Sequence, residues 1–246
     1  MISSLSFVFP MYNEIDNLER TVREATEVGR RITSDLEIVI VDDASTDGSG
    51  GLADRLADEN PHVRVVHHPS NRKLGGALKT GFATATRQWV LYIDSDLPIR
   101  MADALDAVPL TEGADMVIGY RINRCEGLKR EIMSWCYNRL IRVLFGLRVR
   151  DVNFAFKLFR REVLRQVHLE SEGSFIDAEL LLETRRAGFR IAEMGLNYYP
   201  RVAGTSTLAS SSVVLKLLRE MLRYGWNAPA RRRTPTPASL SDRQRG

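Results

Sequence analysis

The chain has 246 residues and a formal net charge of +4, and 44% of its residues are hydrophobic. This length suits a single large α/β domain with a full core. The whole positive charge comes from residues 229–246, where five arginines face one aspartate, so the neutral body of the chain is not a nucleic-acid-binding surface.

Cysteine usage and hydropathy exclude further classes of protein. Cys125 and Cys136 give no disulfide framework and no metal-binding spacing, which is typical of a reducing cytosol. No apolar run reaches the roughly 20 residues that a transmembrane helix needs. The first residues lead into an apolar run without the basic start of a signal peptide. We therefore expect a cytoplasmic protein whose Pro-, Ser- and Thr-containing tail, 229–246, is disordered.

The first predicted strand covers residues 5–10 and ends at Pro10, because proline cannot donate to a hydrogen-bonded ladder. An amphipathic helical pattern follows at once. Either Asn13 or Asp16 is expected to cap this helix, since both residue types are favoured at that position.

The next two predicted strands cover residues 36–41 and 63–67. The first of them ends in the acidic pair Asp42-Asp43, and the loop after it supplies caps for a second helix. The candidate caps are Ser45, Thr46 and Asp47. After the other strand, the His-His-Pro sequence at 67–69 indicates a strand-end turn rather than a catalytic site.

The fourth predicted strand, residues 89–93, leads directly into Asp94-Ser-Asp96 and is the most informative segment. Its aromatic and β-branched residues are typical of a buried strand. Mg²⁺ is usually held in proteins by one or two carboxylates together with substrate phosphates. The two aspartates therefore predict a clamp for a metal-bound diphosphate, and an ordinary turn is the alternative.

Strands and helices alternate along this half of the chain at the spacing of βαβ units. That order predicts a parallel sheet whose ligand crevice lies at the carboxyl ends of the strands. Three of those ends carry carboxylates, and helix capping explains each one singly but not all three together.

Four motifs together resemble family 2 glycosyltransferases with the GT-A fold, and their order and spacing agree over the first half of the chain. They are residues 10–14, 41–48, 75–81 and 94–97. Within that superfamily, the second half is most similar to polyprenyl-phosphate sugar synthases of the dolichol-phosphate mannose synthase type. This closer likeness rests on residues 119–121, 129–138, 151–162 and 201–206. The resemblance implies a mostly parallel nucleotide-binding sheet flanked by helices.

Matching positions in these motifs imply the roles of individual residues. The nucleotide sugar is expected to contact Pro10, Tyr12, Glu14, Asp42, Asp43, Asp94 and Ser95. A Mg²⁺ or Mn²⁺ ion is expected on Asp94 and the catalytic Asp96. The acceptor phosphate is expected to contact Arg121, Ser134 and the catalytic Arg130. Lys73 joins the nucleotide group because it opens a Gly-rich helix close to the nucleotide.

The chain also departs from the pattern of these synthases at three places. Pro98 stands where a metal-ligating Gln is usual, so water or another residue must complete the metal shell. The segment 151–156 replaces the usual Asp-x-x-Ser-Gly-Phe of the acceptor site. Thr207 stands in place of a lysine near the phosphates.

A helix is predicted over residues 131–145, within a segment, 121–150, that carries eight basic and two acidic side chains. Its apolar stripe with Trp135 has two interpretations. A basic amphipathic helix suits a membrane surface or a lipid phosphate, whereas an ordinary domain helix buries such a stripe in the core.

Another helix is expected to start near Phe175, with Asp177 and Glu179 in its first turn. Asp177 either stabilises the helix N-terminus or, like Glu179, lies over the acceptor as a general base.

Together these features predict a metal-dependent inverting glycosyltransferase that moves a hexose from a GDP-mannose- or UDP-glucose-type donor to a polyprenyl phosphate. We expect one GT-A domain over 1–228, with a nucleotide-sugar half of about 1–118 and an acceptor half of about 119–228, at the cytoplasmic face of a membrane. One alternative is a hydroxyl acceptor, with Asp177 or Glu179 as base. Another is a non-catalytic protein that binds nucleotide sugars.

Overall fold

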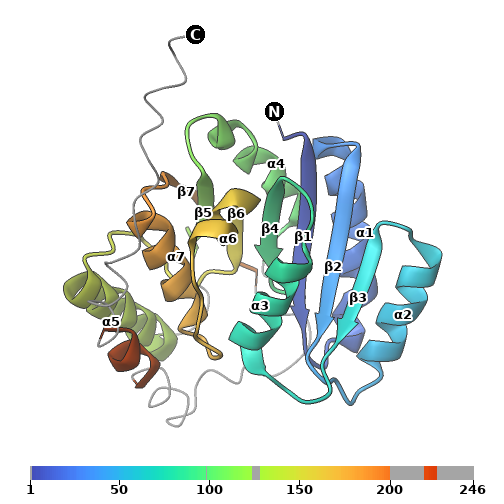
Figure 1. Ribbon diagram of the computed structural model, residues 1–246, viewed down its shortest axis with the longest axis horizontal. Coiled ribbons are helices and arrows are strands. Elements are labelled where there is room, and N and C mark those ends of the chain that lie inside the picture. Colours follow the sequence, from blue (N-terminus) through green and yellow to red (C-terminus); the bar gives the residue numbers. More distant parts are fainter. Residues whose placement is uncertain (1, 98, 124–127, 200–218, 226–246) are drawn as a thin grey trace.

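The computed structural model describes residues 2–97, 99–123, 128–199 and 219–225 and forms one seven-stranded sheet with helices on both faces (Figure 1). The strands are β1 (Ser4–Met11), β2 (Asp35–Asp42), β3 (Val63–His67), β4 (Trp89–Ile93), β5 (Met116–Arg121), β6 (Phe156–Arg160) and β7 (Ile191–Leu196). The helices are α1 (Ile15–Ile32), α2 (Ser49–Glu59), α3 (Lys73–Thr84), α4 (Ala104–Ala107), α5 (Leu128–Phe145), α6 (Arg161–Gln166) and α7 (Ile176–Arg186). Two short 3₁₀ turns are η1 (Met101–Asp103) and η2 (Pro109–Glu112).

The order of the strands is β3-β2-β1-β4-β6-β5-β7, and among them β6 alone runs antiparallel to its neighbours. The predicted mostly parallel α/β sheet is thus confirmed, as are the four predicted strands to within a residue or so at each end. β6 comes from the second half of the chain but lies between β4 and β5. The expected nucleotide-sugar and acceptor halves therefore share one sheet.

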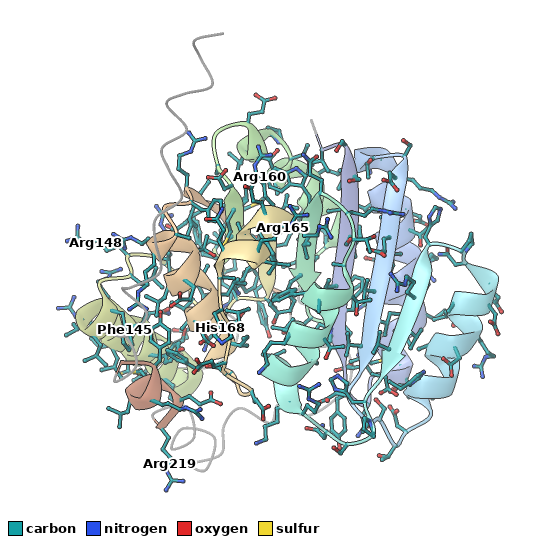
Figure 2. The ribbon with its side chains drawn as sticks, in the orientation of Figure 1. Phe145, Arg148, Arg160, Arg165, His168 and Arg219 are labelled. Atoms are coloured by element: carbon teal, nitrogen blue, oxygen red, sulfur yellow. The ribbon has the colours of Figure 1, made fainter. Side chains whose placement is uncertain are left out.

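Each face of the sheet carries its own apolar core. On one face, α1 buries Leu18, Val22 and Ala25 against strand residues such as Phe7. On the other face, α3, α5 and α7 cover the sheet. There the ring of Phe145, at the end of α5, packs against Phe175 and Tyr224 with centroid distances of 6.2 and 5.5 Å (Figure 2). β4 is buried along its whole length, as its continuous apolar sequence predicts.

The start of α1 is capped from another loop, so the prediction that Asn13 or Asp16 caps this helix is wrong. The Ile15 N–H donates to Oδ2 of Asp47 at 3.2 Å, while Oδ1 of Asp47 accepts from the Ser49 N–H at 2.9 Å. Asp47 thereby binds an N–H group at the start of both α1 and α2. The N-cap position of α2 is Gly48, however, so the prediction that Ser45, Thr46 or Asp47 occupies it is wrong. Asn13 instead accepts a hydrogen bond from the Thr46 N–H.

A buried ion pair fixes α7 to the centre of the sheet. Lys157 on β6 lies opposite Tyr92 on β4, and its Nζ lies 2.6 Å from Oδ1 of Asp177 in the first turn of α7. The two side chains are only 1% and 3% exposed. Nζ also donates to the Phe154 carbonyl at 2.9 Å and lies 5.3 Å from the centre of the Tyr92 ring. Burial raises the pKa of Asp177, and Lys157 opposes that rise.

Removing one partner of this pair should destabilise the fold strongly. We expect Lys157→Met to lower the free energy of unfolding by about 3–5 kcal/mol, because it leaves the Asp177 carboxylate buried and unpaired. Urea denaturation measures the loss. As the control, Lys157→Met combined with Asp177→Leu should recover most of the stability, since an apolar pair of similar volume leaves no buried charge without a partner. A single variant as stable as the double variant would show that the pair does not hold α7.

Candidate functional site

The loops that leave the carboxyl ends of β1 to β4 concentrate unusual backbone conformations. Four non-glycine residues have positive φ among the described part of the chain, and one follows each of these strands. They are Asn13 (57°), Ala44 (63°), Lys73 (62°) and Leu97 (46°). Such conformations cost free energy and persist only where the surroundings hold them, so they mark this edge of the sheet as the functional one.

The loops after β1 and β2 are tied together by hydrogen bonds. The Asn13 N–H donates to Oγ of Ser45, and the Glu14 N–H donates to Oγ of Ser49, each at 2.9 Å. Tyr12, which directly precedes these two anchored residues, is 47% exposed, which leaves its ring open to a ligand. The structure thus brings the predicted β1 residues beside the acidic pair that ends β2.

Asp42 and Asp43 each contact one of two consecutive histidines, His67 at the end of β3 and His68 directly after it. Nδ1 of His67 lies 2.9 Å from Oδ2 of Asp42, and its Nε2 lies 2.9 Å from Oδ1 of Asp54. Nδ1 of His68 lies 2.7 Å from Oδ1 of Asp43. The histidines do form a strand-end turn, but sequence reasoning missed their contact with the predicted nucleoside residues.

The parallel pairing of β2 with β3 contains the signal that would have revealed these contacts. It sets Asp42 opposite His67 in register. Where two neighbouring parallel strands end in Asp-Asp and His-His, the acidic pair and the histidine pair lie side by side. Neither dipeptide alone indicates this contact.

The contact between His67 and Asp42 changes the pKa values of both groups. Burial would raise the pKa of Asp42, but hydrogen bonds from Ser45 and His67 outweigh it and lower that pKa. The hydrogen bonds to Asp42 and Asp54 raise the pKa of the half-exposed His67 above its ordinary 6.5. Both oxygens of Asp42 are therefore used inside the protein, by Ser45 N–H and by His67.

The carboxylates after β4 lie on the same edge. Oγ of Ser95 donates to the Pro10 carbonyl at 2.9 Å, which locks the Asp94–Asp96 loop to the end of β1. The Tyr92 hydroxyl donates to Oδ1 of Asp94 at 3.1 Å, and burial keeps the pKa of Tyr92 far above its ordinary range, so this donor stays protonated. Asp94 is half-buried, and Asp96 is 4% exposed.

These two carboxylates are chemically suited to Mg²⁺ or Mn²⁺. The described residues contain no cluster of three or more His, Cys, Asp and Glu side chains arranged to hold a metal ion. Two carboxylates match a cation that takes its remaining ligands from substrate phosphates and water. Pro98, where a metal-ligating Gln was expected, lies outside the described residues.

A second buried pair orders the part of the chain that was predicted to bind the acceptor. Nε and Nη2 of Arg121 donate to the two oxygens of Asp151 at 2.7 and 3.0 Å. The guanidinium also lies 5.6 Å from the ring centres of both Phe154 and Tyr198. Its side chain is 9% exposed. The predicted phosphate contact thus begins from a guanidinium already held by a carboxylate and two aromatic rings.

The other predicted acceptor residues lie at the start of α5. Oγ of Ser134 accepts from Asn138 at 3.4 Å, and Asn138 in turn accepts from the Val152 N–H at 3.0 Å. These contacts connect α5 to the segment that carries Asp151. Arg130 belongs to the first turn of α5, and its side chain lies outside the described residues.

Both candidate bases in α7 are enclosed and engaged. Asp177 pairs with Lys157 as described above. Glu179 is 1% exposed and accepts hydrogen bonds from the backbone N–H groups of Glu170 and Ser171 at 2.8–3.1 Å. These contacts give both carboxylates a structural role in holding α7 and the loop before it.

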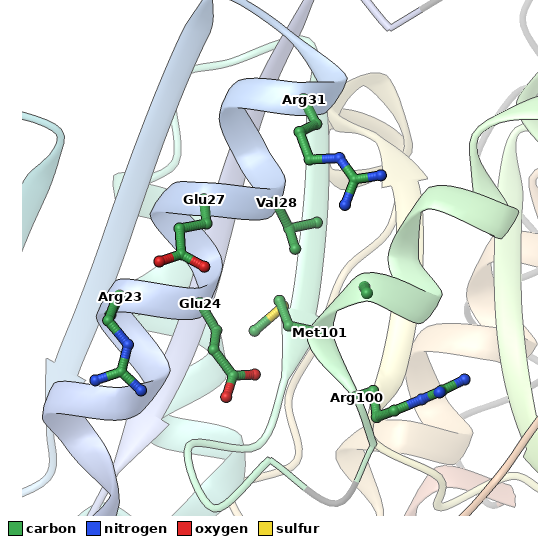
Figure 3. Close-up of a pocket in the computed structure, with 8 residues that line it drawn as sticks. Arg23, Glu24, Glu27, Val28, Arg31, Arg100 and Met101 are labelled. Atoms are coloured by element: carbon green, nitrogen blue, oxygen red, sulfur yellow. The ribbon is translucent and has the colours of Figure 1, made fainter.

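Within the described part of the chain, one cavity touches predicted site residues. A cavity of about 440 Å³ is lined by Lys73, Glu170, Ser171, Glu172, Glu179, Glu220, Arg223 and Tyr224. It joins the start of α3 to the loop before α7. A second cavity of about 410 Å³ lies between α1 and the segment at 100–102 (Figure 3). Its lining includes none of the predicted site residues, so we do not assign it to the reaction.

Comparison with known proteins gives consistent matches over most of the chain. The family described as "Glycosyl transferase family 2" matches residues 6–167. An undecaprenyl-phosphate mannosyltransferase of Micrococcus luteus is 31% identical over 234 residues, covering 89% of this chain and 92% of that protein. A polyprenol monophosphomannose synthase of Mycolicibacterium smegmatis is 31% identical over 221 residues, covering 84% and 81%.

The fold is also found among solved structures. Glucosyl-3-phosphoglycerate synthase from Mycobacterium tuberculosis, in complex with Mg²⁺ and UDP, superimposes with a TM-score of 0.70 at 20% sequence identity. The match covers 90% of this chain and 79% of that one. At this identity the likeness concerns the fold, and it confirms the predicted GT-A architecture.

The pairing of His67 with two carboxylates predicts a pH-dependent contribution to stability. Because its pKa is raised on folding, the contribution is complete below about pH 6.5 and is lost as the pH rises through the folded-state pKa. We expect the difference in unfolding free energy between wild type and His67→Asn to be largest near about pH 6 and to shrink toward about pH 9. Urea denaturation at several pH values measures it. His168→Asn, at a side chain 82% exposed, is the control. A difference that does not change with pH would contradict the charged pairing.

Proposed function

Because this chain belongs to glycosyl transferase family 2, we propose that it transfers a hexose from a nucleotide sugar of the GDP-mannose or UDP-glucose type to a polyprenyl phosphate, with inversion. The chain is a glycosyltransferase of the polyprenyl-phosphate sugar synthase type. The names of the two relatives, undecaprenyl-phosphate mannosyltransferase and polyprenol monophosphomannose synthase, support a lipid phosphate as the acceptor here.

The donor lies along the carboxyl ends of β1, β2 and β4 in this proposal. Tyr12 offers an exposed aromatic face to the base, and Asp43 offers a carboxylate oxygen to an N–H or O–H of the nucleoside. Asp94 and Asp96 hold the Mg²⁺ or Mn²⁺ ion, which neutralises the departing nucleoside diphosphate when bound. Tyr92 and Ser95 keep these two carboxylates in place through their hydrogen bonds to Asp94 and to the end of β1.

The observation that carries the choice of acceptor is that both candidate bases are already bound by groups of the protein. A sugar or other hydroxyl acceptor needs a base to remove its proton, but Asp177 is paired with Lys157. Glu179 lines the cavity at the start of α3, and both of its oxygens accept backbone N–H groups from the loop before α7. A phosphate acceptor is already an anion and needs no such base. Arg121, Arg130 and Ser134 lie around the acceptor phosphate in this proposal, and guanidinium groups suit phosphate oxygens.

A panel of nucleotide sugars, each incubated with and without polyprenyl phosphate, tests this function. We expect lipid-linked sugar and free nucleoside diphosphate to form together, and only with a divalent cation. Asp96→Asn should keep the fold and lower turnover by about two to three orders of magnitude, because it removes charge that the leaving group requires. Asp106→Asn, an acidic residue in α4, is the control.

Three outcomes would contradict parts of the proposal. Transfer to a soluble hydroxyl acceptor, with none to polyprenyl phosphate, would favour the sugar-acceptor alternative. Donor binding without release of nucleoside diphosphate would identify a non-catalytic nucleotide-sugar-binding protein. Near-normal turnover of Asp96→Asn at saturating donor would remove Asp96 from the metal site.

We also propose that α5 rests on the cytoplasmic face of a membrane, where a polyprenyl phosphate is presented. No helix in the described ranges is long and apolar enough to span a bilayer. The apolar residues of α5 lie on two faces of the helix. Tyr137, Leu140 and Ile141 pack toward the core. Another set recurs at intervals of three and four residues and therefore shares one outer face. It comprises Ile132, Trp135, Cys136, Arg139 and Val143.

The outer face of α5 combines exposed apolar groups with positive charge. Trp135 and Val143 are 65% and 67% exposed, and Arg139 lies between them. Arg148, just past the helix, is also exposed and points outward from the same end of the molecule (Figure 2). Such a combination binds anionic lipid through apolar area and charge together.

Vesicle co-sedimentation tests this surface. Trp135→Ser combined with Val143→Ser should weaken association with anionic vesicles by at least about threefold, because the apolar contact area is lost. The melting temperature should not change, since both side chains are exposed. Leu110→Ser, which alters an exposed apolar residue in η2, is the matched control. A wild-type protein that ignores such vesicles would contradict the proposed surface.

A further inference from the structure

The carboxylate of Asp43 is fixed at one oxygen only. Oδ1 lies 2.7 Å from Nδ1 of His68 and also accepts the Arg72 N–H at 2.7 Å. The backbone of Asp43 is held as well, because its N–H donates to the Met11 carbonyl and its carbonyl accepts from Asn71. No hydrogen bond from the described residues reaches Oδ2. The side chain is therefore held rigidly with one acceptor oxygen remaining.

The histidine that holds Asp43 is itself oriented by a third element. His68 follows β3, its side chain is 5% exposed, and its Nε2 lies 2.9 Å from Oγ1 of Thr80 on α3. The backbone N–H of His68 donates to the Asp42 carbonyl at 2.8 Å, which fixes the backbone. When the Thr80 hydroxyl donates to Nε2, the imidazole proton sits on Nδ1 and faces Asp43. A hydrogen bond at one ring nitrogen thus determines whether the other nitrogen is a donor or an acceptor.

The neighbouring aspartate shows that this arrangement is specific to Asp43. Asp42 has a histidine partner too, but both of its oxygens are used, and its histidine is half-exposed. Asp42 therefore holds the loop after β2 with both of its oxygens already engaged by the protein, whereas Asp43 has one oxygen with no hydrogen bond from the described residues. The two Asp–His pairs therefore differ: the pair at Asp42 supports the loop after β2, and the pair at Asp43 is arranged for contact with a ligand.

We infer that His68, held by Thr80, is a positioning residue for the sugar-nucleotide donor. It fixes the Asp43 carboxylate so that Oδ2 faces an N–H or O–H group of the nucleoside. This inference rests on the proposed function, since it assigns the support behind the proposed donor contact. A positioned carboxylate binds the nucleoside equally before and at the transition state, so His68 acts on donor affinity and not on the chemical step.

Calorimetric titration with UDP and GDP, with the divalent cation present, tests the inference in three variants. His68→Ala should weaken binding of the preferred nucleotide about tenfold or more, because a hydrogen bond to a charged group is lost. His68→Asn should stay within about threefold of wild type, since its amide can donate from the position of Nδ1. Thr80→Val should weaken binding about threefold, because it no longer selects the required ring tautomer. His168→Ala is the matched exposed control.

Kinetics and unfolding separate positioning from a purely structural role. The donor KM of His68→Ala should rise by the same factor as its dissociation constant, while kcat changes less than about twofold. Urea unfolding identifies variants that are folded under the assay conditions. Folded His68→Ala and Thr80→Val proteins that bind as tightly as wild type would overturn the inference. A loss in kcat as large as the rise in KM would also overturn it. If wild type itself binds neither nucleotide, the proposed function fails instead.

Discussion

The parallel pairing of β1 with β2 and β4 is the constraint on which the site depends. It aligns Met11 with Asp42, and the adjoining β3 aligns Asp42 with His67, so residues far apart in sequence meet at one edge. The hydrogen bond from Ser95 to the Pro10 carbonyl extends the same edge to the end of β4. Because β1 is paired on both sides, this edge is rigid, and it holds the strained loops that a preorganised site requires.

Paired charges are the second recurring feature. Asp42, Asp43, Asp151 and Asp177 are each 5% exposed or less, and each has a cationic or imidazole partner. A buried carboxylate without a partner is costly, so these partners allow the protein to gather negative groups at the site. The partners also differ in kind: Lys157 sets an ammonium group against Oδ1 of Asp177, whereas His68 sets an imidazole against Oδ1 of Asp43.

The acceptor half combines a firm inner side with an apolar outer side. Arg121, between Phe154 and Tyr198, fixes the region next to β5, while α5 packs inward through Ile141. On the outer side of α5, Trp135 and Val143 are exposed. A transferase that uses a lipid-borne phosphate needs both properties, because a rigid site must meet a substrate that stays in the membrane.

The sequence by itself determined the alternation of strands and helices, the four strand ends with their polar residues, and the family. Local patterns suffice there, because burial periodicity and motif spacing are properties of short segments. Only the tertiary structure decided that Asp47 binds the first N–H groups of two helices, that His67 and His68 hold the acidic pair, and that Lys157 pairs with Asp177. Each of those contacts joins two separate elements. The partners meet because of the strand order and register, and short-range sequence patterns do not contain that information. The apolar stripe of α5 was predictable for the same reason, because it is a local pattern. Its division into an inner and an outer face depends on how the helix packs and was not predictable.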